Sequence, residues 1–411
     1  MEIESHELPI YRPDKMKFEI NKVELSSFEA VITHYLNNNQ ISDLEYSKEG
    51  IFDVINNYIK DYPSNEYKVN NVSKIALQQL LFDFKNVPFP SPENYAFTFI
   101  DLFAGVGGFR LGLQNIGGKC LFSSEWNTDA QKTYKSNFGD VPFGDITKQE
   151  IKNYIPKNFD LLCAGFPCQA FSIAGYRKGF ADTRGTLFFD IEKIIEKHRP
   201  KAIFLENVKN LQSHDSGKTF KVMMDVLENK LGYKIKYHVL NSMTHANIPQ
   251  NRERIFIVGF DPYQIGNYDN FNFPAKIPLE KNINDIIHLE KQKYIYYYQP
   301  THRYFPILQE TVERRDTIYQ WRRVYVRENK SNVCPTLTAN MGSGGHNVPI
   351  IKDDFGIRKL TPRECFSFQG YPEKFLLPST ADSKLYMQAG NSVTVPLIQR
   401  IGLEILKIIG A

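Results

Sequence analysis

The chain is poor in cysteine and lacks any long hydrophobic run. Its 411 residues include 5 cysteines, with no C-x-x-C pair among them, which excludes a disulfide framework and argues against a zinc knuckle. No apolar stretch approaches the roughly 18 residues that a transmembrane helix needs. The first ten residues carry glutamates where a secretory signal would carry basic residues and then an apolar run. These absences predict a globular protein of the cytoplasm.

Neither glycine, proline nor charge dominates the composition. Hydrophobic residues make up 42% and charged residues 23%, which excludes a disordered or fibrous chain. The net charge of +4 is uneven: residues 1–95 hold 15 acidic and 9 basic side chains, and the remainder holds 31 acidic and 41 basic ones. A basic body is compatible with a polyanionic partner, although a solvated surface with a mild excess of lysine and arginine is equally common.

The pattern of apolar residues divides the chain into four parts. Residues 1–94 form an acidic, partly helical extension that closes with a Pro-rich run. From residue 95 to 261, short β-rich runs alternate with helical ones, which predicts βαβ units in an α/β domain with a doubly wound, mostly parallel, Rossmann-like sheet. The predicted strands are 96–103, 119–124, 159–164, 201–205, 234–240 and 255–260, and the predicted helices are 108–115, 128–136, 187–197 and 218–231.

The alternation is lost over 262–382, which predicts a smaller, irregular domain. This part contains an Arg-rich stretch at 314–330 and a cluster of tyrosines at 294–298 that we interpret as packing residues. Isoleucines at helical spacing predict an amphipathic helix over 395–409. Because one face of that helix needs a core to cover it, we expect residues 383–411 to return to the sheet domain.

Candidate ligand-binding residues follow the first three predicted strands. The first strand ends at Phe103 and runs into a turn with Gly105 and Gly107; at the carboxyl end of a strand, glycine lets backbone approach a ligand. Arg110 stands where a dinucleotide fingerprint would have its third glycine, which argues against nicotinamide cofactors. Glu125 and Trp126 follow the second strand, and Asp145 and Ile146 follow the third β-rich region. This order suits a nucleoside without phosphates, such as S-adenosylmethionine.

A thiol, an acid and two guanidinium groups are expected at the same edge of the sheet. Cys168 follows one predicted strand, Glu206 ends the next, and Arg252 and Arg254 precede the last. Alone, Cys168 is more often a small apolar residue filling a turn, and Glu206 could be a surface acid. Beside an adenosyl cofactor, however, the four form a set suited to attack on an electron-poor ring.

The chain resembles the DNA (cytosine-5) methyltransferases, in particular the bacterial restriction–modification type. Six blocks over about 97–411 carry the resemblance: Asp-Leu-Phe-Ala-Gly-x-Gly-Gly, Gly-Phe-Pro-Cys-Gln, Glu-Asn-Val, Gln-x-Arg-x-Arg, Arg-Lys-Leu-Thr-Pro-Arg-Glu and Gln-Ala-Gly-Asn-Ser-Val. The resemblance implies methyl transfer from S-adenosylmethionine to C5 of a cytosine flipped out of duplex DNA. It implies Cys168 as the nucleophile at C6, Glu206 as the group at N3, Arg254 at the cytosine O2 and Arg252 near the thiolate and the base.

Further residues are assigned by the same resemblance. The implied cofactor-binding residues are Phe103, Gly105, Gly107, Glu125, Trp126, Asp145, Ile146, Pro167, Asn391 and Ser392. A catalytic loop over 172–185 is expected to close on the DNA, although a solvated surface loop would have the same composition. The expected DNA contacts are Ser172, Arg177, Lys178, Arg184, Arg322, Arg323, Thr336 and Leu337. Double-stranded DNA is the implied partner of a monomer, together with a separately encoded restriction endonuclease.

Two other functions stay open at this point. One is an RNA (tRNA) cytosine-C5 methyltransferase with the same catalytic blocks, and the other is a DNA-binding regulator that keeps the fold without turnover. The sequence identifies neither the recognition site nor the base that removes the C5 proton. Removal of residues 1–94 is expected to leave cofactor binding intact.

Overall fold

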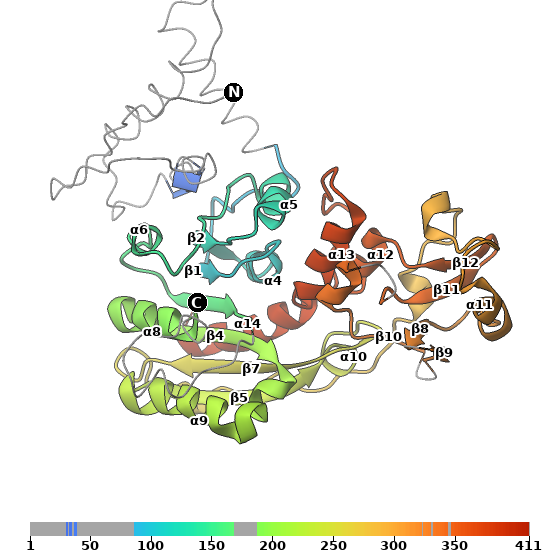
Figure 1. Cartoon of the computed structure of the whole chain (residues 1–411). Helices are drawn as coiled ribbons and strands as arrows, with labels where there is room; N and C mark the ends of the chain where they lie inside the picture. The colour runs from blue at the N-terminus through green and yellow to red at the C-terminus, as the bar shows by residue number, and fades with distance from the viewer. Residues whose placement is uncertain are drawn as a thin grey trace, which may run out of the picture.

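A six-stranded sheet with helices on both faces forms the main body of the chain (Figure 1). The structure is a computed structural model, and it describes residues 30–31, 33–34, 37–38, 86–167, 187–322, 324–329, 332–343 and 347–410. The strands of this sheet are β1 (Phe97–Leu102), β2 (Gly118–Ser124), β3 (Leu161–Gly165), β4 (Ala202–Val208), β5 (Lys234–Asn241) and β7 (Glu253–Phe260).

The order of the sheet is β2-β1-β3-β4-β7-β5. The strands β2, β1, β3 and β4 pair in parallel, whereas β7 is antiparallel to both β4 and β5. The prediction of a mostly parallel α/β sheet is therefore confirmed, with β7 as the reversed strand. The strands β1, β3 and β4 end at the same edge of the sheet. Ligands bind at this carboxyl-terminal edge in open sheets of this kind.

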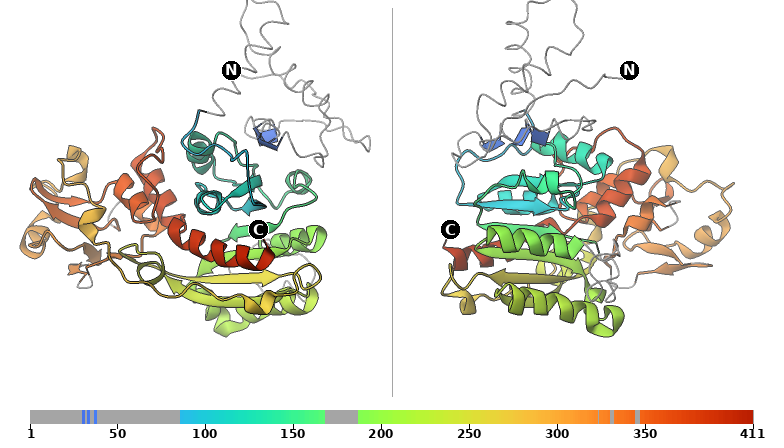
Figure 2. Two further views of the ribbon diagram at one scale, coloured as in Figure 1. Left: turned by 180° about the vertical axis from the view of Figure 1, so that it is seen from behind. Right: turned by 60° about the vertical axis from the view of Figure 1, so that its left-hand side comes forward.

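Two hydrophobic layers enclose the sheet. One contains α8 (Leu187–His198) and α9 (Lys218–Asp225), which pack on the side chains of Ile203 and Leu205. The other contains α4 (Gly108–Gln114) and α14 (Val395–Ile409), which pack on Phe99 and Phe204 with their neighbours. Figure 2 shows the red C-terminal helix lying along the strands on that side. Apolar residues on both faces of each strand make this burial possible.

The main body contains further helical segments among the described residues. They are α5 (Thr128–Phe138), α6 (Gln149–Lys152), η2 (Lys209–Gln212), η3 (His214–Gly217), η4 (Val226–Lys230) and α10 (Ser242–His245). The single helix predicted over 218–231 is in fact α9 followed by the π-helical turn η4. The helix predicted over 395–409 is confirmed and corresponds to α14. Pro396 lies in the first turn of α14, and Gly410, at φ 72°, ends the helix.

A second, smaller region lies to one side of the sheet (Figure 1, orange and red). Its four-stranded sheet has the order β12-β11-β8-β9, all antiparallel. Its strands are β8 (Tyr319–Arg322), β9 (Tyr325–Glu328), β11 (Ile350–Asp353) and β12 (Gly356–Lys359), and its helices are α11 (Phe305–Thr311), α12 (Pro362–Ser367) and α13 (Asp382–Asn391). Short turns complete it: η6 (Ile283–Asp285), η7 (Tyr294–Tyr296) and η8 (Ala339–Gly342). The turn η5 (Tyr268–Asn270) instead lies against β5 of the main sheet, where Lys236 Nζ donates to the Asp269 carbonyl at 2.8 Å.

A short pair of strands joins the two regions. β6 (Gln250–Asn251), just before β7, pairs in parallel with β10 (Cys334–Pro335) of the smaller region. The Gln250 side chain strengthens this connection, since its Nε2 donates to the Phe368 carbonyl at 2.6 Å and its Oε1 accepts from Leu337 N at 3.2 Å. The segment with Arg252 and Arg254 is therefore fixed from both sides.

Candidate active site

The glycine turn after β1 adopts a backbone that leaves room beside it. Phe103, Gly105 and Gly107 have φ values of 58°, 56° and 86°, and a Cβ on Gly105 would meet no atom within 4 Å. On Gly107, a Cβ would lie 2.2 Å from the ring of Phe138. Gly107 is thus required by packing and by its positive φ, whereas Gly105 borders open space at the sheet edge, as a ligand-binding turn needs.

Glu125 links that turn to the end of β2. Its Oε2 accepts from Gly105 N at 2.8 Å and its Oε1 accepts from Asn127 N at 2.8 Å. Burial raises the pKa of this carboxyl, although the bonds from Asn127 and Gly105 oppose that shift. Each carboxylate oxygen can accept a second hydrogen bond, so Glu125 can hold the loop and still receive a pair of hydroxyl groups.

The neighbouring candidates differ in exposure. The Trp126 side chain is 73% exposed, while Ile146 is 3% exposed and belongs to the core beneath α8. Asp145 accepts from Thr147 N at 3.0 Å and from Thr147 Oγ1 at 2.8 Å. An uncovered indole beside an ordered acidic turn fits the adenosyl end of a cofactor. The burial of Ile146 does not fit a contact through its side chain, which packs in the core instead.

Cys168 lies outside the described residues, but the chain leading to it is placed. Gly165 at the end of β3 pairs with Glu206 on β4, and a Cβ on Gly165 would lie 3.7 Å from Glu206 Oε2. The following residue, Phe166, is held by Asn207, whose Nδ2 donates to the Phe166 carbonyl at 2.9 Å. Pro167, which comes next, is exposed. The segment before Cys168 therefore leaves the sheet beside the Glu206 carboxyl.

Glu206 and Arg254 form an ion pair at this edge. Arg254 Nε lies 3.1 Å from Glu206 Oε1, and both side chains are largely buried. Burial raises the pKa of Glu206, against the opposing effect of Arg254 and Arg252. Burial also lowers the pKa of Arg254, against the effect of Glu206. A carboxyl with a raised pKa retains its proton to higher pH and can donate it to a ring nitrogen.

Arg252 has a different set of partners from the one expected. Its guanidinium donates to the carbonyls of Leu337 at 2.7 Å, Gly390 at 3.2 Å and Ser392 at 2.6 Å, and the residue is 2% exposed. Arg252 is expected near the thiolate and the base; its charge acts on the pKa of Glu206, and the hydrogen bonds that it donates go to backbone carbonyls. Carbonyls at the end of α13 and after β10 hold the guanidinium, because a buried cation needs charge-assisted acceptors.

The C-terminal block contributes Asn391 and Ser392 at the end of α13. Asn391 is exposed, and Ser392 Oγ lies 2.6 Å from the Tyr371 hydroxyl. This pair touches the glycine turn, since a Cβ on Gly108 would lie 2.7 Å from the Tyr371 hydroxyl and 3.1 Å from Ser392 Oγ. Ser392 is thus placed against the start of α4, next to the open space at Gly105.

The expected DNA contacts are only partly described. Ser172, Arg177, Lys178, Arg184 and Arg323 lie outside the described residues.

Three further expected contacts are described. Arg322 is exposed on β8 and its Nη2 donates to Gln320 Oε1 at 2.9 Å. Thr336 Oγ1 donates to the Asn251 carbonyl at 2.6 Å. Leu337 is 1% exposed, which does not fit a side-chain contact with DNA: its side chain packs in the core and its carbonyl accepts from Arg252.

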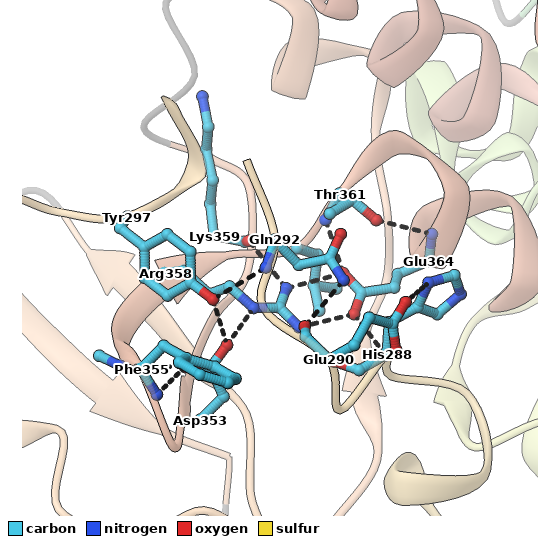
Figure 3. Close-up of polar contacts among 12 residues, drawn as sticks. His288, Glu290, Gln292, Tyr297, Asp353, Phe355, Arg358, Lys359, Thr361 and Glu364 are labelled. Carbon is cyan, nitrogen blue, oxygen red and sulfur yellow. Dashed lines mark hydrogen bonds and ion pairs between the residues drawn. The ribbon is translucent and has the colours of Figure 1, made fainter. Parts of the chain in front are cut away.

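A buried charge cluster organises the smaller region (Figure 3). Arg358 on β12 donates to Asp353 Oδ2 at 2.7 Å, to Glu364 at 2.8 and 2.9 Å, and to the His288 carbonyl at 2.9 Å. Glu364 also accepts from Thr361 N, forming a capping box at the start of α12. The motif around Arg358 therefore has a clear architectural use: it joins β11, β12 and α12.

Sequence reasoning missed three residues that position the site. Asn207 holds the chain before Cys168, Tyr371 holds Ser392, and Gln250 connects the two regions. Asn207 and Gln250 lie inside the sequence blocks quoted above, so their amide side chains could have been identified as candidate positioning residues. No sequence pattern pointed to Tyr371, because its partner Ser392 is distant in the sequence.

Two kinds of feature are absent from the described residues. These residues contain no group of three or more histidine, cysteine, aspartate or glutamate side chains placed to hold a metal ion. Within the same part of the chain, no helix combines the length and apolar character needed to cross a bilayer.

The fold, with its glycine turn at the carboxyl end of β1 and the Glu206–Arg254 pair beside it, is that of a Rossmann-like methyltransferase. Residues 97–407 match the model of the C-5 cytosine-specific DNA methylase family, and the chain belongs to that family. It is a DNA cytosine-5 methyltransferase.

Curated relatives and solved structures agree with this assignment. Type II methyltransferase M.Bsp6I of Bacillus sp. (strain RFL6) is 54% identical over 311 residues, covering 74% of this chain and 97% of the relative. Type II methyltransferase M.HpaII of Haemophilus parainfluenzae is 46% identical over 358 residues, covering 83% and 97%. The crystal structure of the S. pombe Dnmt2 methyltransferase is 19% identical, covers 76% of this chain and 99% of that one with a TM-score of 0.57, and shows likeness of fold.

Proposed function

We propose that the chain methylates C5 of a flipped-out cytosine in a specific duplex DNA sequence, using S-adenosylmethionine and the Cys168 thiol. The observation that carries the proposal is the Glu206–Arg254 pair at the end of β4, beside the segment that leads to Cys168. A raised carboxyl pKa and an adjacent guanidinium are what protonation at N3 and hydrogen bonding at O2 of a cytosine require.

The residues at the end of β1 and β2 fit the cofactor. Trp126 and Phe103 would hold the adenosyl group, Glu125 the ribose hydroxyls and Asp145 the adenine amine. Gly105 would leave room for the backbone to approach, and Ser392 with Asn391 would close the other side. When bound, S-adenosylmethionine supplies an electrophilic methyl group on a sulfonium sulfur.

The protein's own residues then activate the base. The Cys168 thiolate adds to C6, and the electron pair of the C5–C6 bond becomes available at C5. Glu206 holds a proton at N3 and draws electron density toward it, while Arg254 donates to O2. After C5 is methylated, loss of the C5 proton to a base or bound water lets the thiolate leave C6, and the aromatic ring is restored.

We further propose how the chain is divided and where it works. Residues 1–94 are an extension, 95–261 the catalytic domain, 262–382 the target-recognition domain and 383–411 the returning segment. The enzyme acts as a monomer on DNA in the cytoplasm, next to a separately encoded restriction endonuclease of the same system. Arg322 and Thr336, together with the basic residues that follow Cys168 in the sequence, would contact the DNA.

Covalent trapping tests the proposal directly. The full-length protein is incubated with S-adenosylmethionine and duplex oligonucleotides in which cytosines are replaced by 5-fluorocytosine, and the product is separated under denaturing conditions. Because fluorine cannot leave C5 as a proton does, we expect a stable adduct that contains Cys168. Labelled methyl transfer to tRNA and not to duplex DNA, or no transfer to either, would contradict the proposal.

A further inference from the structure

The described residues of the N-terminal extension lie against the outer edge of β2. Residues 30, 31, 33, 34, 37 and 38 are helical, and Figure 2 shows this short blue piece beside the cyan edge of the sheet. The match to the family model begins at residue 97, so the contact involves residues that precede the matched region. We call Thr33, His34, Asn37 and Asn38 the N-terminal brace.

Two asparagines of the brace bind carbonyls of β2. Asn37 Nδ2 donates to the Cys120 carbonyl at 2.8 Å and Asn38 Nδ2 donates to the Leu121 carbonyl at 2.7 Å. The pairing between β1 and β2 skips Leu121, which leaves its carbonyl outside the regular ladder. Cys120 and Leu121 are 1% and 2% exposed. The asparagines therefore satisfy buried acceptors of the edge strand.

His34 binds the next part of the same strand. Its Nδ1 lies 2.9 Å from the Ala30 carbonyl and its Nε2 lies 3.1 Å from Ser123 N. Since a carbonyl only accepts and a backbone amide only donates, the proton is on Nδ1 and Nε2 is the acceptor. Burial lowers the pKa of His34, in keeping with a neutral ring.

The brace also holds the segment that runs beside β2. The His34 ring lies 4.6 Å from the ring of Phe143, centroid to centroid, and Thr33 Oγ1 accepts from Val141 N at 3.0 Å. Phe143 in turn bonds to β2: its N donates to the Ser123 carbonyl at 2.8 Å and its carbonyl accepts from Glu125 N at 2.7 Å. His34 thus lies where these two segments meet.

Both segments lead straight into the proposed methyl-donor site. Ser123 is two residues before Glu125, and Phe143 is two residues before Asp145. We propose that the N-terminal brace positions the nucleoside end of the methyl-donor site, with His34 as the positioning residue that fixes the segments carrying Glu125 and Asp145. This inference rests on the proposed cofactor site, and it runs against the expectation that the extension is dispensable for cofactor binding.

Binding of S-adenosylhomocysteine to the full-length protein, measured by calorimetry, tests the inference. For His34→Ala we expect the Kd to rise about tenfold, about 1.4 kcal/mol of binding, while the Kd for duplex DNA stays within twofold. His34→Gln, whose amide oxygen can take the place of Nε2 as acceptor, should recover most of the affinity. Ser136→Ala, an exposed hydroxyl bonded within α5, is the matched control and should bind as the wild type does.

Two outcomes would overturn the inference. One is a folded His34→Ala protein with unchanged S-adenosylhomocysteine affinity, and the other is equal weakening of cofactor and DNA binding with no recovery in His34→Gln. If His34→Ala does not fold, hydrogen exchange on the wild type decides: the amides of Ser123 and Val141 should be protected, and free exchange at both would contradict the brace. Failure of the wild type to bind S-adenosylhomocysteine would instead contradict the proposed cofactor.

Discussion

Two buried arginine–carboxylate groups in this molecule have very different surroundings. Arg358 in the smaller region is fully buried and donates to two carboxylates and two backbone carbonyls. Arg254 at the sheet edge meets one carboxylate, Glu206, through Nε, and both side chains keep some exposure. A cation with many acceptors is a rigid structural joint, whereas a single ion pair at a ligand-binding edge can exchange partners with a substrate.

The carboxyl groups that pair with these two arginines also have different surroundings. Burial raises the pKa of Glu206 although Arg254 is adjacent. Glu364, in contrast, accepts from Arg358 and from Thr361 N. A carboxyl whose pKa is raised by burial is suited to donate a proton to a base, whereas Glu364 serves as the acceptor that joins β12 to α12.

The largest expected effect on methyl transfer comes from removing the nucleophile proposed to act beside the Glu206–Arg254 pair. Cys168→Ser should reduce methyl transfer by at least ~10³-fold, since the hydroxyl is a far weaker nucleophile than a thiolate. Transfer of labelled methyl groups to duplex DNA measures this, and S-adenosylhomocysteine affinity should stay close to wild type. Substantial residual transfer would refute covalent catalysis.

The next largest effect is on stability and comes from removing Arg358, the structural joint of the smaller region. Arg358→Ala leaves Asp353 and Glu364 buried without their cation, and we expect a loss of about 3–5 kcal/mol of folding free energy, the usual cost of breaking a buried pair. Thermal and urea unfolding measure it. Arg314→Ala, which removes an exposed guanidinium paired with Asp316 in the same region, is the control and should barely change the Tm. Similar Tm values for the two variants would contradict the architectural role of Arg358.

A smaller effect tests the role of the Glu206 carboxyl in catalysis. Glu206→Gln should slow transfer by roughly 10²-fold, the scale for losing an acid catalyst. Because burial raises the pKa of Glu206, the wild-type rate should fall as pH rises through that pKa and the carboxyl loses its proton. The Gln variant should lack this fall. Glu253→Gln, in an exposed pair with Lys209, should keep the wild-type profile, and a rate near wild type for Glu206→Gln would remove its role.

The smallest effect concerns a buried acid. Asp101 on β1 is 0% exposed, and burial raises its pKa to about 8, against the opposing effect of Arg110. Since the folded state binds this proton more tightly than the unfolded state, stability should decline as pH rises from about 4 to 8.

Asp101→Asn removes that dependence. At pH 9 it should be more stable than the wild type by on the order of 1–3 kcal/mol, with the difference shrinking at acidic pH. Urea unfolding at several pH values measures this. A difference that does not change with pH would show that Asp101 is not protonated in the folded protein.

Much of the fold follows from local patterns. The spacing of the isoleucines predicts a helix over 395–409, and α14 has these bounds. The first four strands were predicted within about three residues. The reversed direction of β7 was not predictable, since direction depends on where the preceding connection crosses the sheet.

The site was predictable only in part, as two pairs of residues show. Arg252 and Arg254 stand two apart in one motif, yet Arg252 binds carbonyls from α13 and the chain after β10, while Arg254 meets Glu206. Thr336 and Leu337 are adjacent, yet Leu337 is buried. In each pair, distant segments decide which residue faces the open edge, and the spacing of a motif carries no information about those segments.

The sequence by itself determined the α/β class, the edge of the sheet where chemistry-bearing residues gather and the family to which the chain belongs. These depend on periodicity and on motifs, which are local properties. Only the tertiary structure decided that His34 reaches Ser123, that backbone carbonyls hold the buried Arg252 and that Glu206 forms an ion pair with Arg254. Those outcomes depend on desolvation and on hydrogen-bond partners from distant parts of the chain, and they exist only once the chain has folded.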